Sequence, residues 1–135
     1  MYKCKYFKLY ELVPPEIYKG EDYLKHWFIF DDRCLRAIDI IREKFGKCVV
    51  NTWKGGGSHR YRGFRPFTCD IGAYYSQHKF GRAIDLVPLD EDVNTVRQYL
   101  IDTKGLDGLI TGIELDVDWL HIDCRNYNGL YLFRP

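Results

Sequence analysis

A short apolar run with one acid at its centre constrains the fold more than any other segment. Residues 82–87 read Arg-Ala-Ile-Asp-Leu-Val and predict a strand that ends at Pro88. Alternate residues of a strand face opposite sides, so Asp85 lies opposite Ile84 and Leu86. A carboxylate among such neighbours is costly to bury unless a cation or hydrogen-bond donors meet it. The run therefore predicts a sheet with a polar site on one face.

Two imidazoles accompany this acid. His78 stands seven residues before Asp85, and His121 lies within a second predicted strand, over 119–125, where it shares a face with Asp123. Two histidines and one aspartate on open faces of neighbouring strands supply three ligands and leave a fourth zinc position for water. We therefore expect His78, Asp85 and His121 to bind Zn²⁺.

Two helices are predicted from apolar residues that recur at helical spacing. The first spans 31–46, with Asp31 as its cap and Gly46 at its end. The second spans about 91–103, with Asp90 as its cap and Gly105 just beyond its end. Further strands are predicted at 48–53 and 108–114, and Asn128-Gly129 predicts a tight hairpin turn into Leu130 to Phe133.

These elements predict an α+β fold: a small, largely antiparallel sheet with two main helices packed on it and the zinc site on the sheet. The length of 135 residues suits a single domain, and no linker or repeat divides the chain. Residues 1–30 are rich in aromatic side chains and broken by Pro14-Pro15 and Gly20. We expect them to wrap around the core as a short strand or turn segment.

The net charge and the composition argue against two classes of binding partner, nucleic acids and membranes. The formal net charge is +1, so no general field attracts nucleic acid or an anionic membrane. A basic and aromatic cluster over 54–65 could bind phosphates, but the neutral chain offers it no further basic face. The N-terminus lacks the apolar run of a secretory signal, and the odd count of five cysteines favours a reducing compartment. We expect no nucleic-acid partner and no membrane insertion.

A motif around the first histidine resembles a known family. The residues Ser76, His78, Gly81, Ala83 and Asp85 match the pattern Ser-x-His-x-x-Gly-x-Ala-x-Asp. This pattern is similar to that of the zinc D-alanyl-D-alanine carboxypeptidase and L-alanyl-D-glutamate endopeptidase family, which includes phage endolysins and VanX-type dipeptidases. The run Asp118-Trp119-Leu120-His121 resembles the family's second motif, an acid, two residues and the last zinc ligand.

The resemblance implies a zinc metallopeptidase that hydrolyses an amide bond in the stem peptides of bacterial peptidoglycan. It makes His78, Asp85 and His121 the metal ligands and Asp118 the general base and acid. Asp116 and Glu114 lie close to Asp118 in sequence and compete for this role. Arg65 would stabilise negative charge on the oxygen of the scissile carbonyl.

The same resemblance suggests a phage-encoded enzyme, an endolysin or a virion-associated one. Without a signal peptide, we expect it in the host cytoplasm or as part of a phage virion. We expect a monomer with no separate wall-binding module, acting on peptidoglycan peptide. The alternative is a catalytically inert zinc-binding structural or binding protein with the same fold, as in the related hedgehog signalling domain. The bond that is cut, and the choice between endopeptidase and carboxypeptidase, stay open.

Overall fold

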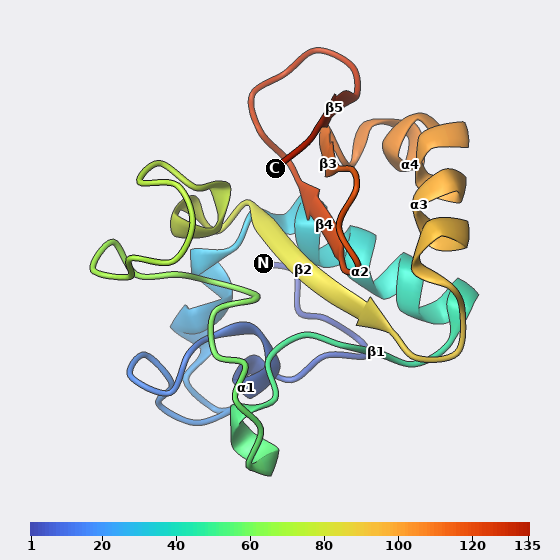
Figure 1. The fold of residues 1–135 in the computed structure, drawn as a ribbon. Coiled ribbons are helices and arrows are strands. Elements are labelled where there is room, and N and C mark those ends of the chain that lie inside the picture. Colours follow the sequence, from blue (N-terminus) through green and yellow to red (C-terminus); the bar gives the residue numbers. More distant parts are fainter.

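Five short strands form one open sheet in the computed structural model, which describes all residues 1–135 (Figure 1). They are β1 Cys48–Val49, β2 Ala83–Pro88, β3 Gly112–Glu114, β4 Leu120–Asp123 and β5 Tyr131–Phe133. The order across the sheet is β1-β2-β4-β3-β5, and only β3 and β5 pair in parallel. The predicted α+β class with a largely antiparallel sheet is confirmed.

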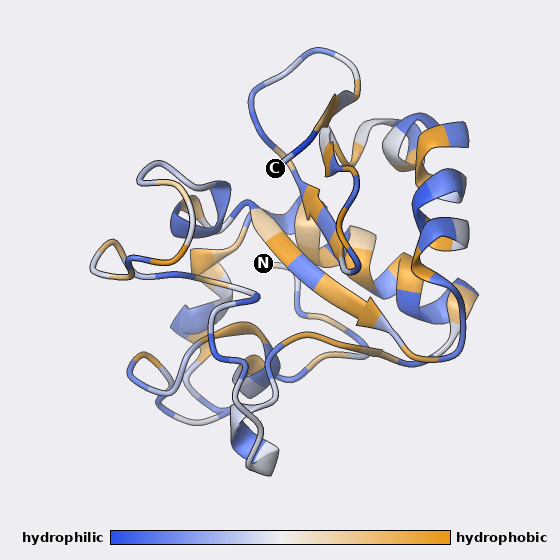
Figure 2. Cartoon of the chain, viewed as in Figure 1, coloured by the Kyte–Doolittle hydropathy of each residue, from blue (hydrophilic) through white to orange (hydrophobic).

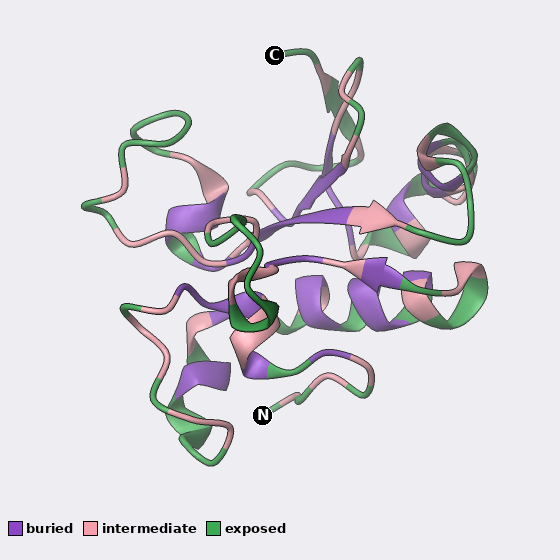
Figure 3. Cartoon of the chain, turned by 60° about the horizontal axis from the view of Figure 1, so that its bottom comes forward, coloured by how far each residue is buried: buried purple, intermediate pink, exposed green.

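Helical segments alternate with these strands along the chain. They are α1 Leu9–Leu12, the 3₁₀ helix η1 Leu24–Ile29, α2 Asp32–Phe45, the 3₁₀ helices η2 Trp53–Gly55 and η3 Gln77–Phe80, α3 Val93–Asp102 and α4 Lys104–Gly108. The bounds of α2 are as predicted, because the Asp31 carboxylate accepts a hydrogen bond from the Arg33 amide and Gly46, at φ 91°, ends the helix. The buried side of α2 faces β1 and β2 (Figure 3).

The second long helix starts two residues later than predicted. α3 begins at Val93, and its N-cap is Asp92, whose carboxylate accepts a hydrogen bond from the Asn94 amide at 2.8 Å. The Asp90 carboxylate instead accepts a hydrogen bond from the Lys47 amide at 2.7 Å. Both acids are suitable caps, and this tertiary contact next to β1 removes Asp90 from the helix.

The predicted strand over 108–114 is shorter in the structure. Five consecutive residues, Lys104 to Gly108, have positive φ and turn the chain before β3 begins at Gly112. Left-handed backbone is unfavourable for most residues, so this turn depends on its surroundings. A β-carbon at Gly105 would lie 2.1 Å from the carbonyl oxygen of Ile110, which requires glycine at this close approach.

Two strand predictions are wrong in detail. The strand expected over 48–53 pairs only as β1, because the chain turns at Asn51 to bond the N-terminal segment: the Asn51 amide donates to Glu11 and its side chain to Val13. The expected hairpin after Asn128-Gly129 does not form either. β5 pairs in parallel with β3, so it joins the far edge of the sheet rather than folding back on β4.

One apolar core joins α2, the sheet and the N-terminal segment. The side chains at its centre are fully buried; they include Leu9, Leu12, Leu35, Ile38, Ile84, Leu86, Leu120 and Ile122. A polar anchor adds to this packing, since the buried Asp39 carboxylate accepts hydrogen bonds from the Tyr2 hydroxyl and the Lys5 amide. Within this hydrophobic setting, a hydrophilic band interrupts β2 (Figure 2).

The cysteines are not all separate in the structure. Cys34 on α2 and Cys124 after β4 are paired as a disulfide. Cys4, Cys48 and Cys69 are free. No helix combines the length and the apolar character needed to cross a membrane.

Candidate metal centre

Three elements bring the predicted ligands together. His78 lies in η3, whose N-cap Ser76 accepts a hydrogen bond from the His78 amide at 3.3 Å. Asp85 on β2 and His121 on β4 are direct partners in the antiparallel register, so their side chains share one face of the sheet. Gly81 ends η3 with φ 68° and returns the chain into β2.

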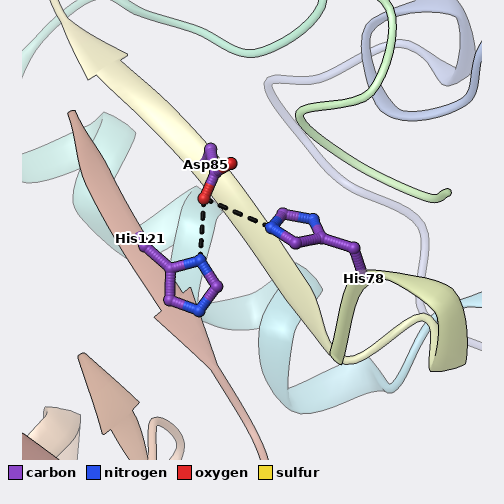
Figure 4. Close-up of side chains that lie close together, drawn as sticks. All are labelled: His78, Asp85 and His121. Atoms are coloured by element: carbon purple, nitrogen blue, oxygen red, sulfur yellow. Dashed lines mark hydrogen bonds and ion pairs between the residues drawn. The ribbon is translucent and has the colours of Figure 1, made fainter. Parts of the chain in front are cut away.

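Figure 4 shows the two imidazoles converging on one carboxylate oxygen. Asp85 Oδ1 lies 2.8 Å from His121 Nδ1 and 3.3 Å from His78 Nε2. All three residues are buried, and one ligand atom from each lies within 4.8 Å of the others. Ligands of a tetrahedral zinc ion with bonds of about 2.0–2.1 Å stand roughly 3.3 Å apart, so the cluster has the size of a metal site. It could hold a metal ion, with a further coordination position left open.

Outer partners fix the orientation of both rings. His78 Nδ1 donates to the Gly63 carbonyl at 2.8 Å, which leaves its Nε2 free as a ligand. His121 Nε2 lies 3.0 Å from the Asp123 carboxylate, which leaves Nδ1 toward Asp85. Carbonyls and carboxylates of this kind set the tautomer of metal-bound histidines. The donor set therefore fits a metal ion in its outer contacts as well.

Asp123 has a supporting role that the sequence reasoning missed. It is fully buried, and Arg125 Nε donates to it at 2.8 Å. A β-carbon at Gly112 would lie 2.2 Å from Asp123 Oδ1, so glycine on β3 makes room for the carboxylate. The available signal was the two-residue spacing from His121, which places both side chains on one face.

Charge in the cluster is balanced across its members. Burial alone would raise the pKa of Asp85, but the His78 and His121 imidazoles hold that pKa well below its usual value. Burial alone would lower the pKa of His121, but hydrogen bonds to Asp123 and Asp85 raise it to about 9. Burial holds the pKa of His78 below its ordinary value. The Asp85 and Asp123 carboxylates thus favour a positive charge between them. A divalent cation in the cluster would meet the same negative surroundings.

Arg65 reaches the same site from the loop before η3. Its Nη2 lies 3.3 Å from Asp85 Oδ2, and its Nε donates to the Tyr61 carbonyl at 2.7 Å. Only 12% of the side chain is exposed. The guanidinium is therefore held by contacts on two sides, next to the cluster where the sequence placed it.

A pocket of about 480 Å³ opens onto the cluster. Its wall includes charged and aromatic side chains beside the three ligands, among them Arg65, Arg125, Glu114, Trp119, Tyr75 and Phe133. The pocket thus offers both charged groups and aromatic surface to a small ligand.

Asp118 lies differently from the other predicted site residues. It is exposed, and it lines a neighbouring hollow with Arg97 rather than the pocket above the cluster. Arg97 donates to the carbonyls of Val117 and Trp119 and so holds the bend before β4. Glu114, at the end of β3, does line the pocket. The structure thus brings together His78, Asp85, His121 and Arg65, and leaves Asp118 beside them.

Asp116 is removed from the site altogether. Its carboxylate pairs with Arg134 on the surface, and its backbone has a positive φ of 60° in the bend before β4. Among the three acids before β4, only Glu114, the last residue of β3, lines the pocket.

Comparison with known proteins adds no relative to this picture: no family model, no curated protein and no solved structure matches the chain.

Proposed function

We propose that this protein is a zinc metallopeptidase that hydrolyses an amide bond in peptidoglycan stem peptides, encoded by a phage as an endolysin or a virion-associated enzyme. The observation that carries the proposal is the buried His78–Asp85–His121 cluster, whose donors fit a metal ion and whose spacing resembles that family's motif. The pocket of about 480 Å³ above it supports a peptide-sized ligand.

Each group of the site has a distinct task in such a reaction. When bound, zinc would polarise the scissile carbonyl and lower the pKa of a water molecule to roughly 7. His78, Asp85 and His121 would hold the ion, and the Gly63 carbonyl and the Asp123 carboxylate orient the two rings. The Arg65 guanidinium, permanently charged, would stabilise negative charge that develops on the carbonyl oxygen.

Proton transfer requires one more carboxylate near the reacting atoms. By the resemblance this is Asp118, three residues before His121. Its neighbour Trp119 lines the pocket, whereas Asp118 itself lines the adjacent hollow with Arg97. Glu114 already lines the pocket and is the structural competitor for this task.

The direct experiment is digestion of purified peptidoglycans of different chemotypes by zinc-loaded protein, with mass spectrometry of the released fragments. We expect cleavage at one type of peptide bond, and none after chelation or in His121→Ala. A parent protein that binds zinc but releases no fragment from any wall would contradict peptidase activity. The fragments would also identify the bond, and so separate endopeptidase from carboxypeptidase action.

The second candidate function is a catalytically inert zinc-binding structural or binding protein with the same fold. The exposed position of Asp118, outside the pocket lining, favours it. The two candidates differ in turnover but agree in metal content, so only the digestion experiment separates them.

A further inference from the structure

The disulfide between Cys34 and Cys124 encloses the whole metal centre in sequence. Its two residues are 90 positions apart, and His78, Asp85 and His121 all lie between them. Both cysteines are fully buried, Cys34 in the first turn of α2 and Cys124 directly after β4. Cross-links that close long loops restrict the chain most strongly. The redox state of this pair can therefore change the structure on which the ligands depend.

Cys124 lies where the cross-link meets the contacts of the metal centre. The carboxylate of the residue before it, Asp123, lies 3.0 Å from His121 Nε2, and the residue after it, Arg125, donates to the same carboxylate at 2.8 Å. Cys124 is also anchored to the residue before β2, because its amide donates to the Arg82 carbonyl at 2.8 Å. The disulfide thus fixes the backbone next to the carboxylate that orients the His121 ring.

The packing around Asp123 leaves its carboxylate little room to shift. Asp123 is fully buried, and a β-carbon on Gly112 would lie 2.2 Å from its Oδ1. In a close-packed interior, displacement of one segment is passed to the side chains that it contacts. Two thiol sulfurs stay at van der Waals distance, which is longer than a disulfide bond. Reduction therefore moves Cys124 relative to α2, and the adjoining Asp123 moves with it.

The reduced pair also has a place in the fold. Cys34 Sγ lies 3.1 Å from the Arg82 carbonyl oxygen, so the Cys34 thiol has a hydrogen-bond acceptor within reach. Arg33 Nη2 donates to the Cys124 carbonyl at 3.2 Å, and this contact joins α2 to the end of β4 without the sulfurs. Both contacts favour a folded dithiol form, so the two redox states are alternatives of one fold.

We propose that the Cys34–Cys124 pair is a redox switch for the metal centre. As a disulfide it holds Asp123 against the His121 ring and gives tight zinc binding, whereas the dithiol binds zinc more weakly. This inference rests on the proposed function for the identity of the metal and adds how the site is regulated. Cytosolic thiols are kept reduced, whereas disulfides persist in oxidising surroundings such as the periplasm and the cell surface. The switch would therefore tighten the site in the compartment that contains the cell wall.

The oxidant for this switch is a small-molecule disulfide or a protein disulfide, which reacts by thiol–disulfide exchange. The thiolate of one cysteine attacks the oxidant, whose S–S bond breaks, and a mixed disulfide forms with release of one thiol. The other cysteine then attacks the mixed disulfide, so that the Cys34–Cys124 bond forms and the second thiol leaves. The pair loses two electrons and two protons, and the oxidant gains them as two thiols.

The test measures the zinc affinity of the parent in both redox states. Protein is equilibrated in glutathione buffers of defined ratio and then freed of glutathione without air. Alkylation and peptide mass spectrometry assign the state of Cys34 and Cys124, and competition with a chromophoric chelator gives the zinc affinity. We expect the disulfide form to bind zinc at least about tenfold more tightly, the low end for a group that orients a metal-bound histidine.

Two variants and a control trace the effect to these contacts. Cys34→Ser cannot form the bond, so it should bind zinc like the reduced parent and not respond to oxidant. Asp123→Asn should show little redox dependence, because the switch acts through this carboxylate. Cys69→Ser removes a free cysteine elsewhere and should keep the full difference. Circular dichroism checks the fold of each protein, and the reduced parent gives the dithiol result even if Cys34→Ser does not fold.

The outcomes for the switch and for the proposed function are distinct. Equal zinc affinity in the two redox states would overturn the switch, even if the enzyme is active. A redox difference of undiminished size in Asp123→Asn would overturn it too, because the coupling would then bypass the carboxylate. Redox-dependent zinc affinity in a protein that releases no fragment from any peptidoglycan would support the switch while contradicting the peptidase.

Discussion

The two faces of the β2–β4 pair are both buried, yet they are stabilised in different ways. On one face Ile84, Leu86 and Ile122 belong to the apolar core. On the other, Asp85 and His121 are almost as inaccessible, at 7% and 8% exposure. The apolar face gains roughly 25 cal/mol per Å² of buried surface without needing particular partners. The polar face is tolerated only because each donor and acceptor is matched.

Because alternate residues of a strand face opposite sides, neighbouring residues of β2 and β4 belong either to the apolar core, which stabilises the fold, or to the polar cluster. A shift of register by one residue would place the acid and the imidazole in the core and expose the aliphatic side chains. The aliphatic face thus fixes the register that aligns Asp85 with His121. Variants on the two faces should consequently change different measured quantities.

The largest effect is expected from loss of a ligand on the polar face. His78→Ala or His121→Ala should weaken zinc binding by about 3–5 kcal/mol, one ligand's share of the roughly 10–16 kcal/mol typical of structural zinc sites. Metal analysis of protein purified without added zinc should give close to one equivalent for the parent and little for either variant. His59→Ala, at an exposed position, is the control. Full zinc content in both variants would rule out this ligand set.

A core variant should change folding without changing the metal. Leu86 is fully buried, so Leu86→Ala should lower the free energy of unfolding by about 2–5 kcal/mol. Urea unfolding should show the same loss with and without a chelator, while the folded variant keeps its zinc equivalent. Leu89→Ala, on a side chain 57% exposed, should cost little. A loss seen only with zinc present would show that the two faces are coupled.

Substitutions of the three acids before β4 test which carboxylate, at the edge of the polar face, transfers the proton. Asp118→Asn should keep zinc and lower turnover by at least about a hundredfold, the low end for general acid–base catalysis. Glu114→Gln should lose much less, and Asp116→Asn, which removes only a surface ion pair, serves as the control. A larger loss in Glu114→Gln than in Asp118→Asn would move the proton transfer to the acid that lines the pocket.

A substitution at Asp123 tests how much the contacts around the ligands contribute to zinc affinity. Asp123→Asn keeps the shape but removes the charge beside His121 Nε2, and we expect zinc affinity to fall about tenfold to a hundredfold. Competition with a chromophoric chelator measures the affinity. Asp102→Asn, a change on the solvent side of α3, is the matched control. Unchanged zinc affinity would show that Asp123 pairs with Arg125 without supporting the metal site.

The polar face should also make zinc binding depend on pH. The pKa of His121 is raised to about 9, so its proton must leave before Nδ1 can bind zinc. Zinc affinity should therefore increase about tenfold per pH unit from 7 to 9 and then level off. In the absence of zinc the sign reverses: the raised pKa stabilises the fold below about pH 6.5, and this stability is lost as pH rises through about 9. Calorimetry in two buffers should detect one proton released per zinc at pH 7–8, and a flat affinity would contradict the assignment.

Local sequence signals predicted both ends of α2 correctly but placed the start of α3 two residues too early. The side-chain partner of Asp31 is Arg33 of the same helix, so no distant contact draws Asp31 from the cap and the predicted bounds hold. Asp90 and Asp92 are equally good caps in sequence, and the Lys47 amide decides between them. The turn at Asn128-Gly129 suggested a hairpin, but a turn determines only the local direction. Which strand receives β5 depends on β3, a partner well before it in the chain.

The sequence by itself determined the three residues of the cluster that could hold a metal ion. Two-residue alternation places Asp85 and His121 on one face where the two strands pair, and the short segment between His78 and Asp85 lets η3 bring His78 beside them. The tertiary structure decided which acids and cations surround them. Glu114, at the end of β3, lines the pocket, whereas Asp118 lies at the bend held by Arg97 and lines a neighbouring hollow. Alternation is a property of each strand alone, whereas these placements depend on contacts between segments far apart in the chain.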